Sequence, residues 1–221
     1  EGIDRPNLRL EAADVFDDKQ KLQQIMNVIQ SYPGSGIIYF SLIRKLEEFS
    51  EKLTQAGIRH DIYHGKLEGP RRKRVQREFI EGKDKIILAT NAFGMGIDKP
   101  DIRFVLHAEL PSSPEAYYQE IGRAGRDGEP SLCLLLYNSE DLYTQMQFID
   151  WANPDENYYH RLYELLVSQP VEVNAMGYEF VMEQLSHKNK HDFRLDTALG
   201  MLDRYGITEG SLDEKNLKVL T

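Results

Sequence analysis

Four short runs of mostly apolar residues, each about the length of a β-strand, recur through the first 137 residues of the chain. The runs are 37–40, 85–89, 102–106 and 132–137. A strand that is apolar along its whole length is typical of a parallel sheet buried on both faces. Apolar residues at helical spacing fall between the runs, over 18–31, 43–53 and 70–80. The alternation predicts an α/β fold, a parallel sheet with helices on both faces.

Polar residues stand directly after these predicted strands. Weaker strand patterns over 5–10 and 58–63 add an entry strand and a short further strand. The polar residues at the strand ends are Ser41, His64, Thr90 and His107. Ligands of open α/β sheets collect outside the carboxyl ends of the strands, so this edge is the expected place for a site.

The pattern changes to helices after about residue 139. Helical spacing of apolar residues covers 142–149, 158–166, 176–185 and 195–205. The tail over 206–220 can then form a small β-hairpin, and a helix followed by a hairpin suggests the start of a winged helix. We therefore expect two domains, an α/β domain over 1–138 and a smaller, mostly α-helical region over 139–221.

Composition excludes several classes of protein. The net charge of −9 excludes a global polycation, so nucleic acid has to be bound by local basic patches. The basic helical face at 71–77 is interpreted first as a solvated face. The single cysteine, Cys133, excludes a disulfide framework and a four-cysteine zinc site. No stretch approaches a membrane span. A reducing, cytoplasmic setting is expected, and the start without Met suggests a piece of a longer protein.

Two arginines lie three residues apart between glycines in Gly122-Arg-Ala-Gly-Arg-Asp-Gly128, just after a short helix that Ser113 can cap. Arginine is permanently charged and offers a planar fork of donors that suits phosphate oxygens. Such an arginine can act as an arginine finger on a nucleotide bound elsewhere. It can also belong to a turn whose arginines pair with surface carboxylates, and this stretch alone leaves both interpretations open.

Three stretches together resemble one family. They are Gly36-Ile-Ile-Tyr39, Ala92-Phe-Gly-Met-Gly-Ile-Asp-Lys-Pro100 and Tyr117-Tyr-Gln-Glu-Ile-Gly-Arg-Ala-Gly-Arg-Asp-Gly128. In this order and spacing they are similar to motifs IV, V and VI of a superfamily 2 helicase of the RecQ type. The resemblance covers residues 5–137 well. It implies the second RecA-like domain of an ATP-dependent DNA helicase that unwinds in the 3′ to 5′ direction.

The resemblance also implies roles for single residues. Arg126 matches the arginine finger and Arg123 the arginine beside it, with both expected to point at the nucleotide phosphates. The other nucleotide-binding positions would be Gln119, Asp98, which reaches the ribose in related helicases, and Gly96. The DNA-binding positions would be Thr90, Lys99, His64 and Ser41, with Thr90 and Lys99 expected at the same DNA-facing end. A satisfied loop histidine remains open for His64, and a turn acid for Asp98.

Several sequence features of the family are missing from this chain, and their absence limits which ligands the chain is expected to bind. The run Tyr39-Phe-Ser-Leu-Ile-Arg44 lacks the Ser-Arg pair that many members carry there, and the cysteines of a following zinc subdomain are missing. The chain also lacks a phosphate loop and an Asp-Glu-x-His stretch. ATP and Mg²⁺ would therefore be held mainly by the preceding N-terminal RecA-like domain, which with DNA is the expected partner. The fragment alone is expected to be inactive.

Two further functions remain open from the sequence. The chain could be a catalytically silent nucleic-acid-binding module whose C-terminal helices are the working surface. It could also come from an RNA helicase of the same superfamily. A phosphate loop in the parent protein would disfavour the first, and a comparison of stimulation by DNA and RNA would decide the second.

Overall fold

The computed structural model describes residues 5–94, 96–185 and 193–220. Contacts within the chain divide it into two compact units, Glu1–Tyr143 and Thr144–Thr221. Helix α5 (Ser139–Ala152) runs across this division. The domain boundary expected at residues 138 and 139 falls where α5 begins.

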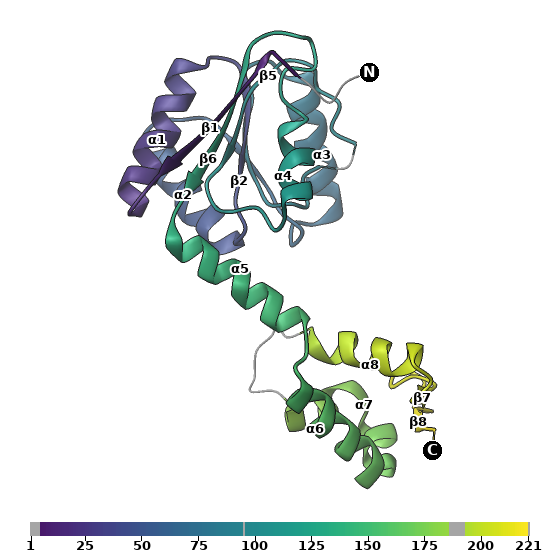
Figure 1. Ribbon diagram of the computed structural model, residues 1–221. Coiled ribbons are helices and arrows are strands. Elements are labelled where there is room, and N and C mark those ends of the chain that lie inside the picture. Colours follow the sequence, from purple (N-terminus) through teal and green to yellow (C-terminus); the bar gives the residue numbers. More distant parts are fainter. Residues whose placement is uncertain (1–4, 95, 186–192, 221) are drawn as a thin grey trace. The chain divides into compact units, whose positions relative to one another are not determined.

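The first unit is built on a six-stranded parallel sheet with the strand order β1-β6-β5-β2-β4-β3. The strands are β1 (Leu8–Asp14), β2 (Ser35–Tyr39), β3 (Asp61–Tyr63), β4 (Ile86–Ala89), β5 (Ile102–His107) and β6 (Ser131–Tyr137). The helices are α1 (Asp18–Ser31), α2 (Ile43–Gln55), α3 (Gly69–Glu81) and α4 (Pro114–Ile121). Figure 1 shows α1 and α2 on one side of the sheet and α3 and α4 on the other. The predicted α/β fold is confirmed.

The sheet separates two hydrophobic clusters. Ile38 and Leu88 point into the cluster that α1 and α2 cover, whereas their neighbours Ile37 and Ile87 point into the cluster that α3 covers. Every residue of β2 is buried, as its apolar run predicts. Gly36 has no space for a side chain, because a Cβ there would lie 2.0 Å from the Phe104 ring.

The first strand differs from the expectation. The sequence predicts an entry strand over 5–10, but β1 begins at Leu8 and continues to Asp14. Residues 5–8 form a turn in which the Leu8 N–H donates to the Arg5 carbonyl oxygen at 2.9 Å. The whole strand lies at the sheet edge and pairs only with β6, and from Leu10 onward its residues alternate between exposed and half-buried. An edge strand of this kind carries no continuous apolar run that would mark it in the sequence.

The start of α4 is as predicted. The Ser113 hydroxyl accepts a hydrogen bond from the Ala116 N–H at 3.1 Å, and Pro114 occupies the first turn. An N-cap serine satisfies one of the backbone donors that a helix leaves unpaired at its start. This cap fixes where the helix before the two arginines begins.

The second unit contains α6 (Glu156–Ser168), α7 (Pro170–Leu185), α8 (Arg194–Arg204) and an antiparallel hairpin of β7 (Thr208–Glu209) and β8 (Lys218–Val219). Its core includes Leu162, Val181, Leu195 and Ala198. The expected hairpin after the last helix is therefore present. None of the described helices has the length and apolar character needed to cross a membrane.

Helix α7 begins six residues before the predicted start at Met176. Pro170 suits the first turn of a helix, because its missing N–H is not needed there. Gly177 then interrupts the helical backbone with φ 71° and ψ −150°. This is a left-handed φ that glycine adopts readily, so α7 is two helical segments joined at Gly177.

Candidate functional site

Residues 122–128, called the arginine loop below, follow α4 and return the chain to β6. Gly125 has a left-handed φ of 52°, and Gly128 one of 85°. A Cβ on Gly125 would lie 2.6 Å from the Asn7 side-chain nitrogen and 2.8 Å from the Glu129 carbonyl oxygen. The loop therefore requires glycine at this point both for its backbone and for space.

Arg126 lies at the surface end of the loop. Its Nη1 donates to Asp98 Oδ1 at 2.9 Å and to the Ile97 carbonyl oxygen at 3.3 Å. The side chains of Arg126 and Asp98 are 37% and 88% exposed. A guanidinium whose charged partner is an exposed carboxylate can exchange that partner for another anion, because exposed ion pairs are weak.

Arg123 contacts the same loop between β4 and β5 as Arg126 does, but nearer to β4. Its Nη1 donates to the Gly94 carbonyl oxygen at 2.6 Å. A Cβ at Gly94 would lie 2.6 Å from Nη2, so the missing side chain is what admits the guanidinium. Arg123 is thus bonded to backbone inside its own domain, and the expectation that both arginines point at a nucleotide stays a prediction.

Tyr39 ties the end of β2 to the same loop. Its hydroxyl donates to the Phe93 carbonyl oxygen at 3.0 Å, and its ring stacks on His107 with centroids 5.3 Å apart. Burial raises the pKa of Tyr39, and the nearby Arg123 guanidinium lowers it by a smaller amount. The phenol is therefore neutral and acts as a donor. The three family-like stretches meet around Tyr39, Gly94 and Arg123.

The remaining predicted nucleotide positions lie near these residues in the chain. Gln119 is exposed on α4. Gly96 has a left-handed φ of 77° in the loop between β4 and β5. A Cβ there would lie 3.5 Å from the Gln76 side-chain nitrogen, an ordinary contact, so the need for glycine at this position is conformational.

Four polar residues predicted at strand ends do share the carboxyl edge of the sheet. They are Ser41, His64, Thr90 and His107, which follow or end β2, β3, β4 and β5. The Thr90 N–H donates to the Tyr63 carbonyl oxygen at 3.1 Å and so continues the pairing of β3 with β4. Thr90, His64 and His107 are all buried.

Ser41 is held by a residue that sequence reasoning missed. The Ser41 hydroxyl donates to the Leu110 carbonyl oxygen at 2.7 Å. The Glu109 carboxylate accepts from the Ser41 and Leu42 N–H groups at 2.7 and 3.0 Å. Glu109 thereby caps α2, whose own N-cap position, Leu42, offers no side-chain acceptor. Burial raises the pKa of Glu109, against the lowering effect of these N–H groups.

His64 is a buried histidine with weak polar contacts. Its Nε2 lies 3.9 Å from Glu47 Oε1, and its Nδ1 lacks a hydrogen-bond partner within the described residues. Burial lowers the pKa of His64, Glu47 opposes this, and Arg71 and Lys66 add to the lowering. The imidazole is therefore neutral at pH 7, and any contact with a phosphate would be a hydrogen bond without charge.

Lys99 lies at the opposite edge from Thr90, so the expectation of a shared end is wrong. Its ammonium donates to the Gly82 carbonyl oxygen at 2.7 Å and pairs with Asp101 at 3.0 Å. Gly82 ends α3 before β4, and Asp101 precedes β5, so both mark the amino edge of the sheet. Lys99 is 3% exposed, and its charge is used inside the domain.

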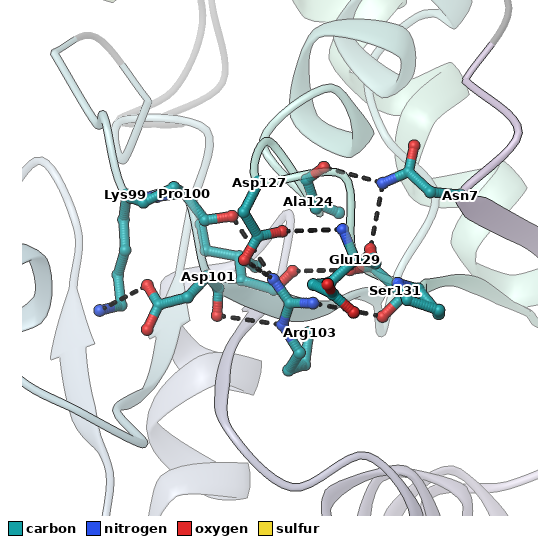
Figure 2. Close-up of polar contacts among 12 residues, drawn as sticks. Asn7, Lys99, Pro100, Asp101, Arg103, Ala124, Asp127, Glu129 and Ser131 are labelled. Atoms are coloured by element: carbon teal, nitrogen blue, oxygen red, sulfur yellow. Dashed lines mark hydrogen bonds and ion pairs between the residues drawn. The ribbon is translucent and has the colours of Figure 1, made fainter.

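The arginine loop is clamped from the start of the chain. Arg5 Nη2 donates to the carbonyl oxygens of Ala124 and Gly125 at 2.9 and 2.7 Å. Asn7 donates to the carbonyl oxygens of Gly125 and Glu129 at 2.8 and 3.1 Å, and Figure 2 shows it beside the loop. These contacts join residues more than a hundred positions apart in the sequence, and nothing in the local sequence predicts them.

A second missed arginine supports the loop from β5. Arg103 pairs with Asp127 at 2.5 Å, and its guanidinium also donates to the Pro100 and Asp101 carbonyl oxygens (Figure 2). The hydrogen bond from Arg103 holds the pKa of Asp127 below its usual range. Arg5, Asn7 and Arg103 therefore fix the loop that presents Arg126.

Comparison with known proteins defines the class of this domain. Residues 20–128 match the family described as "Helicase conserved C-terminal domain". A DEAD box protein from the hyperthermophile Methanococcus jannaschii superposes with a TM-score of 0.52 at 25% identity, covering 65% of this chain and 39% of that one. The α/β domain is therefore the RecA-like C-terminal domain of a superfamily 2 helicase.

Relatives in sequence specify the family further. "RecQ-like DNA helicase blm-1" of Caenorhabditis elegans is 48% identical over 136 residues, which cover 59% of this chain and 14% of the relative. "Probable ATP-dependent DNA helicase RecS" of Bacillus subtilis is 40% identical over 148 residues, or 66% of this chain and 30% of the relative. The chain belongs to the RecQ-type helicases, and its matches span less than a third of these relatives.

One further relative bears a different name. A protein of Acanthamoeba polyphaga mimivirus, named as an ATP-dependent RNA helicase, is 42% identical over 157 residues. These residues cover 71% of this chain and 28% of that protein. Relatives named for DNA and for RNA therefore share comparable identity with this domain.

Proposed function

We propose that this chain is the C-terminal part of an ATP-dependent DNA helicase that moves 3′ to 5′ and that Arg126 is its arginine finger. One observation carries the proposal. Arg126 is the motif arginine whose guanidinium reaches the surface, and its carboxylate partner, Asp98, is itself 88% exposed. Both groups are therefore accessible to a nucleotide held by another domain.

The residues around Arg126 fit a nucleotide. A guanidinium suits phosphate oxygens, and an exposed carboxylate such as Asp98 can accept hydrogen bonds from ribose hydroxyls. Gly96 and Gln119 complete the proposed contacts. ATP, bound with Mg²⁺ mainly by the preceding RecA-like domain, supplies the phosphoryl group that is transferred to water. For its part, Arg126 releases Asp98 and stabilises the charge that develops on the phosphate oxygens.

The proposed DNA contact lies at the carboxyl edge, with Ser41, Thr90 and His64. Thr90 and His64 are buried, so their first role is to shape the loops that meet the DNA backbone. Contacts between these loops and the DNA backbone would hold phosphates without reading the base sequence. Lys99 is not included, since its ammonium is already bonded at the other edge.

The decisive experiment uses the full-length parent protein and measures ATP hydrolysis with and without single-stranded DNA. Arg126→Ala should lower stimulated turnover on the order of 10³–10⁵-fold while ATP binding is kept. Arg77→Ala, at an exposed arginine on α3, is the matched control. Equal turnover of Arg126→Ala and wild type would overturn the finger. The isolated fragment should show no appreciable ATPase activity.

One other function has specific support, and another would follow from a negative result. The mimivirus relative favours an RNA helicase, so single-stranded RNA is compared with DNA in the same assay. Stronger stimulation by RNA would replace DNA as the proposed substrate. A parent without turnover on either nucleic acid would favour the silent binding module.

We propose a cytoplasmic location, associated with the nucleoid if the source is bacterial, in keeping with the single buried thiol of Cys133.

A further inference from the structure

The second unit contains a groove that the helicase mechanism does not use. It has a volume of about 290 Å³ and lies between α8 and the β7–β8 hairpin, with Tyr178 of α7 contributing to its wall. Figure 1 shows α8 leading into the hairpin. Ligand pockets span roughly 300–1,000 Å³, so this groove lies at the small end of that range, a size that suits one long side chain.

One face of α8 forms a side of the groove. Asp196, Leu199, Gly200 and Asp203 all line it, at the spacing that places residues on one side of a helix. Apart from its chain neighbours and the backbone of its own helix, no atom lies within 4 Å of the position where a Cβ on Gly200 would stand. The missing side chain therefore keeps the middle of the groove open between the two carboxylates.

The hairpin side combines apolar and polar groups. Leu212 and Leu217 line the groove and are buried, and Asp213 adds a third carboxylate. Asp196, Asp203 and Asp213 have no salt-bridge partner within the described residues. The part of the chain that the structure describes also contains no group of three or more Asp, Glu, His or Cys side chains placed to hold a metal ion. The groove is thus apolar at its base and negative at its rim.

Thr208 contributes a buried hydroxyl to the wall of the groove. It lines the groove, its side chain is 2% exposed, and its hydroxyl oxygen is buried without a hydrogen-bond partner within the described residues. A buried hydroxyl without a partner is unfavourable and uncommon in folded proteins. A donor group that reached this hydroxyl from the groove would satisfy it.

We propose that this groove binds an arginine or lysine side chain from a basic segment of a partner protein. The apolar base suits the methylene stem of such a side chain, the three carboxylates suit its charge, and Thr208 accepts one of its hydrogen bonds. Nucleic acid is disfavoured, because the rim carboxylates repel phosphates. Asp and Glu also outnumber Lys and Arg over residues 144–221.

The test uses the full chain and a short fluorescein-labelled peptide of alternating alanine and arginine, followed by fluorescence anisotropy. A peptide with citrulline in place of arginine has nearly the same shape without charge and should not bind. Signals of Gly200, Thr208 and Gly210 in a ¹H–¹⁵N spectrum should shift with the arginine peptide. Equal binding of both peptides, or shifts confined to other regions, would overturn the proposal.

Variants separate the groove from general acidity. Gly200→Leu fills the groove with a good helix-forming residue and should abolish binding. Asp203→Asn should weaken binding on the order of two- to fivefold, as should Thr208→Val, which keeps the shape. Glu183→Gln removes an exposed charge on α7 outside the groove and should have no effect. Equal weakening by Glu183→Gln and Asp203→Asn would mean that only the net charge acts.

Free agmatine distinguishes the source of the cation. It carries the same guanidinium on a short stem, and it should compete with the peptide only weakly if a protein segment is the ligand. Tight binding of agmatine together with no binding of the peptide would overturn the protein partner. Unchanged circular dichroism of each variant shows that a loss of binding is not a loss of fold.

Discussion

The guanidinium of Arg5 lies 2.7 Å from the carbonyl oxygen of Gly125, although 120 residues separate them in the chain. Gly125 stands between Arg123 and Arg126, so the start of the chain holds the backbone from which both arginines project. The residue that presents the proposed finger is therefore fixed by an arginine outside the motif.

Arg5→Ala should destabilise the domain by about 1.5–3 kcal/mol, because charged hydrogen bonds to two carbonyl oxygens are lost. Urea unfolding of the chain measures this change. Turnover of the full-length protein should also fall, though less than with Arg126→Ala, because the finger remains but its loop is loosened. Arg9→Ala, at an exposed arginine of β1, is the control. Equal effects of the two substitutions would contradict the clamp.

Glu120→Ala should destabilise the domain by about 1–3 kcal/mol. The Glu120 carboxylate lies 2.8 Å from His107 Nε2, and His107 Nδ1 already lacks a partner within the described residues. Removing the carboxylate leaves a second buried ring nitrogen unpaired. Thermal unfolding compares this variant with Gln119→Ala, its exposed neighbour on α4. No difference between them would show that the pair is not stabilising.

Glu109→Gln should raise stability relative to wild type, and by more as the pH rises. The folded state holds the Glu109 proton more tightly than the unfolded chain, because burial raises the pKa of this carboxyl above 4.5. The free energy of unfolding of wild type therefore falls between pH 4.5 and the raised pKa. A glutamine oxygen can still accept from Ser41 and Leu42 without carrying charge.

The measurement for Glu109 is urea unfolding at a series of pH values, expressed as the difference between variant and wild type. This difference removes the contributions of other groups, such as the nearby Lys21 and Asp141, which form a buried pair. A difference that does not change with pH would contradict the prediction. Glu109→Ala, which removes both acceptor contacts, should be destabilised at every pH.

Cys133 should react slowly with a thiol reagent while the protein is folded. It is fully buried on β6, and burial raises its pKa to about 12. At pH 8 the thiolate fraction is then about a thousandfold smaller than for a free cysteine. Reaction with Ellman's reagent should become rapid in denaturant. Rapid reaction of the folded chain would mean that β6 opens readily.

The sequence predicted the central strands because each is apolar along its length, and it predicted α4 because Ser113 and Pro114 mark its start. It predicted an entry strand over 5–10 but not the true bounds of β1, which is half-exposed at the edge, and it missed the early start of α7. For the site, the spacing of Arg123 and Arg126 identified the motif but not their different partners, a backbone carbonyl for Arg123 and an exposed carboxylate for Arg126. These contacts with Gly94 and Asp98 exist only in the folded loop. Lys99 was assigned to the wrong edge because a buried lysine bonded to backbone looks like any other lysine in sequence.

The pairing of β1 with β6 also constrains the order in which this domain can fold. The first strand, β1, hydrogen-bonds only to the last strand, β6. The pairing that begins at Leu8 can therefore form only after Ser131 has been synthesised. Pairings between residues so far apart in the chain are slow to close. On the ribosome, the inner strands can assemble first, whereas the Arg5 clamp and the loop carrying Arg126 are completed last.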